Sequence, residues 1–190
     1  MNNGEPQRLP TEALHQRFIR GLGHSVVQHS EPADKPLLLD LALPLPPKIR
    51  LYLFNCTHPP GGRSMGEHKI QVMLPGQNRG TRANFEDSDG RMVLLAGYQQ
   101  ELDVYILWDA GLYRDIPFSR NVQVSPETVY AAYAGQVVEQ TRYLRYTGIG
   151  EVPEIIVAAH SRNLLKAVER RQALTLQRLT RRHLWQDCKV

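Results

Sequence analysis

Short runs rich in β-branched and aromatic residues dominate the middle of this 190-residue chain, and they constrain its fold more than any other feature. Clusters of Gly, Pro, Asn and Asp separate the runs at fairly regular spacing, which is typical of strands joined by turns in a barrel or sandwich. The runs are residues 49–56, 68–74, 92–98, 104–108 and 121–124. Because residues 104–108 are apolar on both alternating faces, we expect a central strand covered on both sides. The pattern predicts an α+β fold with a β-rich barrel or pseudobarrel core and flanking helices.

Three segments around this core have helical signatures. Residues 11–22 begin at Thr11 and repeat apolar side chains at helical spacing. A second helix is expected from Pro126, behind a capping Ser125, to about Glu139. The last helix is expected at about residues 163–185, after an apolar strand at residues 154–159. The five prolines of residues 30–47 predict an ordered connector instead of helix or central strand.

These elements predict one compact domain with three parts: an N-terminal helix and Pro-rich connector (1–47), a β-rich core (48–160) and a basic C-terminal helix (161–190). The two cysteines, Cys56 and Cys188, are far apart and indicate neither a disulfide framework nor a zinc site. No apolar run approaches the roughly 20 residues of a membrane span, and the N-terminus lacks the pattern of a secretory signal. We therefore expect a cytoplasmic protein with no membrane partner.

Positive charge is concentrated at the C-terminal end. The formal net charge of the chain is +4, yet residues 160–190 contain eight Lys or Arg and two Asp or Glu, so this segment is +6 and the remainder is −2. On a helical wheel one stripe is apolar (Leu164, Leu165, Val168, Leu176, Leu179) and the other side is basic (Lys166, Arg170, Arg171, Arg178, Arg181). We expect the apolar face to dock on the core. The basic face fits either a phosphate-facing element or an ordinary solvated helix.

A short acidic and basic motif raises the possibility of a nuclease. In Gly66-Glu67-His68-Lys69, a carboxylate and a lysine separated by one residue at the edge of a strand match half of the signature of metal-dependent nucleases. Glu67 would help to hold Mg²⁺, and Lys69 would steady the attacking water or the phosphate. The second carboxylate would be Asp40, which is separated from the motif by a whole strand and a glycine-rich loop. A strand-entry ion pair or a DNA contact is the alternative role of this motif.

Two loops flank the same predicted strand and share a composition suited to DNA. Residues 57–64 and 75–82 are rich in Gly, hydroxyl, amide and arginine groups. Glycine lets the backbone approach a phosphate, and Arg, Asn and Gln recognise base edges in a major groove. A third segment of this kind is residues 118–123. Each of these segments also fits an ordinary hydrophilic loop.

Several motifs resemble domains associated with bacterial restriction-modification systems. They are RSMGEHKIQ at residues 63–71, LLAG at 94–97, the run at 104–109 and NVQV at 121–124. The resemblance covers roughly residues 49–159 and implies a DNA-recognition module of the plant-like pseudobarrel kind, in which two loop arms grip the major groove. Such domains have Arg or Lys at the position of Lys69, which argues against Lys69 as a nuclease lysine. The basic C-terminal helix has no counterpart in the resemblance.

The leading hypothesis is therefore a sequence- or modification-sensitive DNA-binding protein of a restriction or phage-defence system, which recognises double-stranded DNA without a cofactor. Its expected contact residues are Arg63, Ser64, Lys69, Gln71, Arg79, Arg82, Arg120 and Asn121. The second hypothesis is a Mg²⁺-dependent endonuclease that uses Glu67, Lys69 and Asp40. The third is a non-catalytic subunit that binds another protein through Leu164, Val168 and Leu179 of the last helix.

Overall fold

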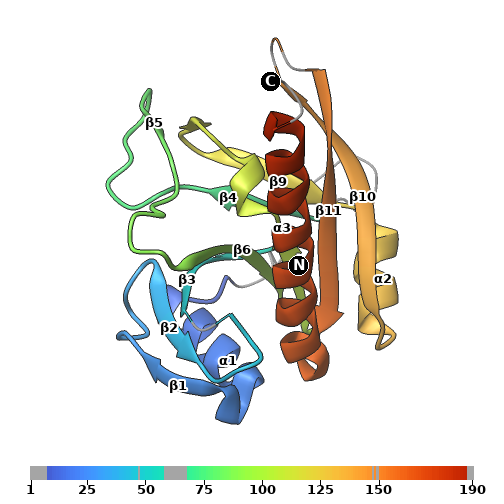
Figure 1. Ribbon diagram of the computed structural model, residues 1–190. Helices are drawn as coiled ribbons and strands as arrows, with labels where there is room; N and C mark the ends of the chain where they lie inside the picture. Colours follow the sequence, from blue (N-terminus) through green and yellow to red (C-terminus); the bar gives the residue numbers. More distant parts are fainter. Residues whose placement is uncertain (1–7, 47, 58–67, 147, 149, 188–190) are drawn as a thin grey trace, which may run out of the picture.

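A computed structural model describes residues 8–46, 48–57, 68–146, 148 and 150–187, and its centre is a seven-stranded sheet (Figure 1). The strand order is β1-β2-β3-β6-β7-β11-β10, and only β3 and β6 run parallel to each other. The strands are β1 Val26–His29, β2 Leu37–Leu41, β3 Lys48–Asn55, β6 Met92–Gln99, β7 Val104–Trp108, β10 Val137–Tyr146 and β11 Gly150–His160. The sheet is open, because its edge strands β1 and β10 do not pair with each other.

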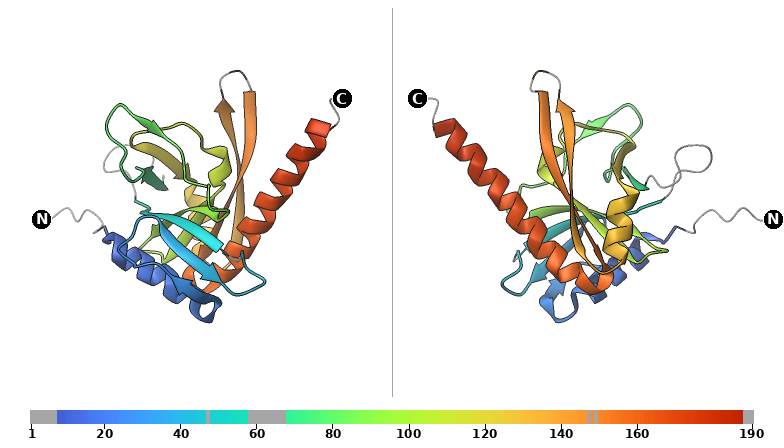
Figure 2. Two further views of the ribbon diagram at one scale, coloured as in Figure 1. Left: turned by 60° about the vertical axis from the view of Figure 1, so that its left-hand side comes forward. Right: turned by 90° about the vertical axis from the view of Figure 1, so that its right-hand side faces the viewer.

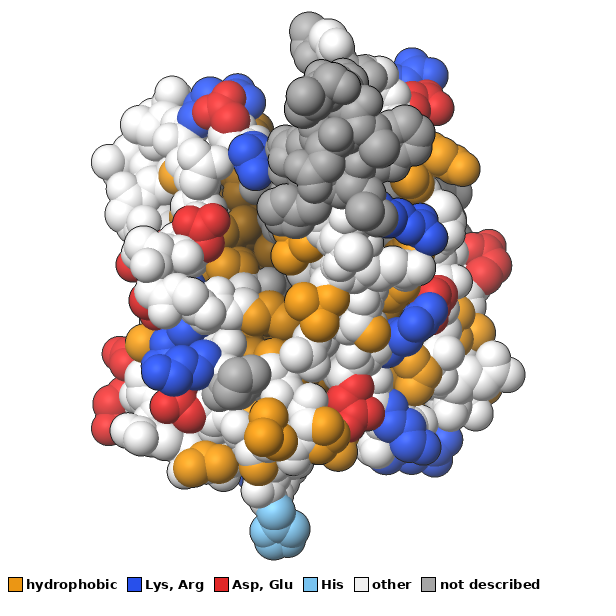
Figure 3. Space-filling view, in the orientation of Figure 1, with side chains coloured by type: hydrophobic (Ala, Val, Ile, Leu, Met, Phe, Trp, Pro, Cys, Tyr) orange, Lys and Arg blue, Asp and Glu red, His pale blue; other side chains and the backbone are white. Residues whose placement is uncertain are grey.

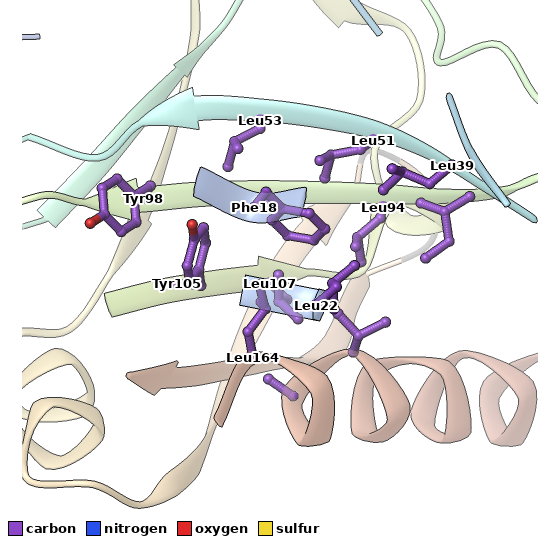
Figure 4. Close-up of a cluster of buried hydrophobic side chains, with 14 of the residues drawn as sticks. Phe18, Leu22, Leu39, Leu51, Leu53, Leu94, Tyr98, Tyr105, Leu107 and Leu164 are labelled. Atoms are coloured by element: carbon purple, nitrogen blue, oxygen red, sulfur yellow. The ribbon is translucent and has the colours of Figure 1, made fainter. Parts of the chain in front are cut away.

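A hydrophobic core covers each face of this sheet. On one face, helix α1 (Thr11–Leu22) and the first turns of α3 (Leu164–Asp187) pack against alternate strand residues such as Leu51 and Leu107 (Figure 4). On the other face, Tyr52, Ile106 and their neighbours pack against β4 (His68–Val72), β9 (Arg120–Val124) and α2 (Pro126–Tyr133). Every residue of β7 is buried, as expected for a central strand covered on both sides.

Among the residues that the structure describes, two small sheets form no strand pairs with the large one. Strands β4 and β9 form an antiparallel pair, and so do β5 (Arg82–Ala83) and β8 (Ile116–Pro117). Each of these pairs joins segments more than thirty residues apart in the sequence. None of the helices in the described ranges is long and apolar enough to cross a membrane.

The predicted α+β class is confirmed, with a large open sheet in place of a closed barrel. Two elements differ from the expectation. The helix that begins at Pro126 ends at Tyr133, because Gly135 adopts a φ of +103° and the chain then enters β10. The Pro-rich connector contains β2, whose residues alternate between buried and half-buried. Its prolines lie at the borders, before Leu37 and after Leu41, where they remove no hydrogen bond from the strand.

Candidate nucleic-acid interface

The β4–β9 ribbon has one apolar and one polar face. Its inward residues include Ile70 and Val72 of β4 and Val122 and Val124 of β9, all of which belong to a buried core. Residues between them point the opposite way, because side chains alternate along a strand. The apolar half of the alternation thus fixes the ribbon on the body of the protein and turns the polar half to solvent.

The outward face of this ribbon, which we call the amide face, consists of Lys69, Gln71, Asn121 and Gln123. The antiparallel register sets Lys69 opposite Gln123 and Gln71 opposite Asn121. Gln71, Asn121 and Gln123 are exposed, and Lys69 is half-buried. The side-chain amide of Gln71 donates a hydrogen bond of 2.5 Å to the hydroxyl of Ser119, which restricts the orientation of its head group.

The loop at residues 75–82 returns to the same region. The Gln77 amide donates to the carbonyl of Ile116 at 2.8 Å, and the Phe118 N–H donates to the Thr81 carbonyl at 3.2 Å. Together the loop and the β8–β9 turn enclose a shallow hollow of about 560 Å³, which Arg79, Arg82, Phe118 and Ser119 help to line. Figure 3 shows the surface hollowed next to the β5 segment. The hollow and the amide face meet at Ser119.

Residues 47–168, well over half of the chain, match the model of a family described as methylase-associated X1. The chain belongs to the methylase-associated X1 family. This membership associates it with methylases and restriction-modification systems. Neither the curated proteins nor the solved structures contain a match to the chain.

The family match includes all the described residues that we expected to contact DNA, and the structure distributes them unevenly. Lys69, Gln71 and Asn121 lie together on the amide face. Arg79 is exposed and lines the adjoining hollow. Arg82 lines the same hollow, but its Nε lies 2.5 Å from a carboxylate oxygen of Asp115.

Arg120 precedes Asn121 on β9 and therefore points to the opposite face of the ribbon. Its guanidinium carbon lies 5.0 Å from the centre of the Tyr113 ring, a cation–π geometry. Arg63 and Ser64 lie outside the described residues, as does Glu67. Of the residues that we expected to contact DNA, the structure thus brings together Lys69, Gln71 and Asn121, with Arg79 and Arg82 beside them.

The carboxylate proposed for a nuclease lies elsewhere in the fold. Asp40 is on β2 of the large sheet, where Arg91 donates to it at 2.6 Å, whereas Lys69 is on the β4–β9 ribbon. Within the described part of the chain, no group of three or more His, Cys, Asp and Glu residues is arranged to hold a metal ion. The structure therefore does not bring Asp40 and Lys69 to one sheet.

Two arginines that we assigned to the solvent face of the last helix instead point into the protein. Arg171 is only 2% exposed, and Arg178 donates to Asp109 at 2.6 and 3.0 Å. Leu176 and Leu179, expected to dock, are 55% and 40% exposed. The inner face of the helix is formed by Leu164, Arg171 and Arg178, which are spaced by seven residues. The helix is therefore turned about its own axis relative to the predicted orientation.

Those arginines belong to a buried polar network that sequence reasoning missed. The fully buried Glu154 carboxylate accepts from Arg142 at 2.6 Å and from the Tyr113 hydroxyl at 2.8 Å. Asp109, 4% exposed, accepts from Arg178 and, at 3.4 Å, from Arg171, and its N–H donates to Glu154 at 3.3 Å. The seven-residue spacing of Leu164, Arg171 and Arg178 was the one available signal, and it gave no hint of the acidic partner.

Burial dominates the protonation behaviour of this network. It raises the pKa of the Glu154 carboxyl, and the neighbouring Arg142 guanidinium opposes that effect. Burial and the charge of Glu154 also raise the pKa of Tyr113, so its hydroxyl keeps the proton that it donates. Asp109, Tyr113, Arg142 and Glu154 lie within the family match, whereas Arg171 and Arg178 lie beyond it. The network joins the family domain to the C-terminal helix.

Proposed function

We propose that this chain is a DNA-binding component of a restriction-modification system and works together with a methylase. The observation that carries the proposal is the amide face. A two-stranded ribbon is narrow enough to enter the major groove, where amide side chains bind base edges. Family membership supplies the methylase context.

In this proposal the contacts divide into two kinds. Gln71 and Asn121 of the amide face contact bases, while Lys69, Arg79 and Arg82 neutralise phosphates around them. Arg63 and Ser64, which precede β4 in the sequence, complete the expected set, whereas Arg120 points away from the amide face. The partner is double-stranded DNA, and binding needs no metal.

The test is a titration of labelled duplex DNA with the full chain in EDTA, followed by fluorescence anisotropy over a salt series. We expect affinity that falls steeply as salt rises, because each phosphate contact releases counterions. Absence of binding at low salt would overturn the proposal. Adding Mg²⁺ to the same complexes tests the nuclease alternative, which requires cleavage that depends on Mg²⁺ and is lost in Glu67→Ala.

A second candidate, a subunit that binds a protein partner, is favoured by the exposed distal part of α3. The helix diverges from the β10–β11 hairpin towards its C-terminal end (Figure 2). Leu176 and Leu179 are exposed there, whereas Leu164 and Val168 are buried in the protein's own core and are not available to a partner. This candidate predicts a complex with a methylase that resists salt and is weakened by Leu176→Ser.

A further inference from the structure

We infer that Gln71 and Asn121 together read the major-groove edge of adenine and distinguish it from adenine methylated at N6. This inference rests on the proposed DNA binding and makes it specific. It names the base, the two atoms of the base that are read, and the covalent modification that blocks the reading.

The geometry of the pair comes first. Gln71 and Asn121 are directly opposite in the antiparallel register, so their Cβ atoms are about 4.5–5.5 Å apart. Both side chains are exposed. Two amide head groups thus stand side by side, one pair from the end of a ribbon whose other face is fixed in the core.

The hydrogen bonds around the pair leave recognition groups available. Gln71 uses one N–H on Ser119, which leaves its second N–H and its carbonyl oxygen for a ligand. Among the described residues, none forms a hydrogen bond with the Asn121 side chain. The bond to Ser119 orients one amide before DNA arrives, which lowers the entropy that binding must offset.

The donor and acceptor pattern of an amide selects adenine. In the major groove adenine presents the N6 amino group as a donor and N7 as an acceptor, which match the carbonyl oxygen and the N–H of one amide. Guanine presents two acceptors at its major-groove edge and is matched by Arg or Lys. The pair formed by Gln71 and Asn121 contains two amides and no cation, and Lys69 belongs to the other pair of the amide face.

Methylation at N6 removes the group that the amide would read. Of the two N6 hydrogens, one pairs with thymine and the other faces the major groove. A methyl group compatible with Watson–Crick pairing takes the second position, so the donor to the amide oxygen is lost and a bulky apolar group replaces it. A chain that accompanies a methylase would in this way separate unmodified DNA from DNA that has been methylated.

The experiment has two stages. The full chain first binds a random-sequence duplex pool at low salt, and the bound DNA is sequenced. We expect enrichment of adenine in the wild type and in Gln100→Ala, a control at an exposed glutamine of the β6–β7 turn, and loss of that enrichment in Gln71→Ala and Asn121→Ala. Circular dichroism checks that each variant is folded.

In the second stage the enriched duplex is prepared with N6-methyladenine or with 7-deazaadenine at the enriched position. Each change should weaken binding about 5- to 150-fold, the range for loss of one bidentate contact. Binding of the pool with no adenine enrichment, or with no effect of N6 methylation, would overturn this inference and leave DNA binding standing. No binding of any pool at low salt would overturn both.

Discussion

The amide face and the C-terminal helix differ in how many of their polar and charged side chains are available on the surface. Helix α3 has a net charge of +4, from six Lys or Arg and two Asp or Glu, which equals the net charge of the whole chain, yet Arg171 and Arg178 are bound to Asp109, and Arg170 is paired with Glu139 at 2.5 Å. The ribbon has a single lysine on its outward face, and its amides point to solvent. The region with less charge is therefore the better candidate for reading DNA.

This difference shows that counting charges along a sequence does not show which of them are free to bind a ligand. An arginine stays protonated when buried, so it must find an anionic partner inside the fold. Asp109 provides that partner from a turn after β7, sixty or more residues away in the sequence. Arg171 and Arg178 thus serve to hold α3 on the sheet.

The largest effect should come from removing the acid that the two helix arginines share. Asp109→Ala leaves Arg171 buried without its carboxylate, and such a change costs about 3–5 kcal/mol in the free energy of unfolding. Urea denaturation measures the loss. The matched control is Asp115→Asn, which removes the exposed charge partner of Arg82, keeps a side chain that tolerates the φ of +49° at this position, and should cost at most about 1 kcal/mol. Equal losses in both variants would show that the Asp109 network does not hold α3.

A smaller loss of stability is expected in Tyr113→Phe. The variant keeps the ring but removes the hydroxyl that donates to Glu154, and a hydrogen bond to a charged group contributes about 1.5–3 kcal/mol. Urea denaturation again reports the change. Tyr143→Phe, at a tyrosine that is 64% exposed on β10, is the control and should be neutral. A neutral Tyr113→Phe would mean that Arg142 and the Asp109 N–H satisfy the Glu154 carboxylate without the hydroxyl.

The DNA affinities of variants in the two regions should show directly which region contacts DNA. Arg79→Ala should weaken binding by about 1–3 kcal/mol if the side chain reads a base, or reduce the salt slope by about 0.9 if it contacts a phosphate. Arg170→Ala, at an exposed arginine of α3, should leave affinity unchanged because its guanidinium is paired with Glu139. Anisotropy titrations at matched salt compare them. A larger effect at Arg170 than at Arg79 would transfer the DNA contact to the helix.

The sequence predicts those elements whose own pattern is strong. The apolar runs that became β3, β6 and β7 and the helix α1 match the structure to within one or two residues. Strand β10 was missed because its inward residues are only half-buried and its outward residues include Glu139 and Tyr143, so its alternation lacks a continuous apolar side. The periodicity of apolar residues in a sequence reflects burial, and the residues of the edge strand β10 are only half-buried or exposed.

The candidate site was predicted residue by residue but not as a surface. Gln71 and Asn121 were both proposed as DNA contacts, yet their position opposite each other depends on pairing between strands fifty residues apart. The opposite orientation of Arg120 depends on the same register. A pairing partner at that distance is set by the whole core, and no local pattern in the sequence encodes it.

The smallest expected effect concerns the exposed ion pair between Glu139 of β10 and Arg170 of α3. Glu139→Gln releases Arg170, and because both side chains are at least one-third exposed, the free energy of unfolding should fall by at most about 1 kcal/mol. The change also frees one positive charge on α3. If the helix lies against phosphates, affinity for DNA should rise and the salt slope should steepen by about 0.9. If DNA binds at the amide face, both should stay unchanged, which is the outcome that we expect from anisotropy over a salt series.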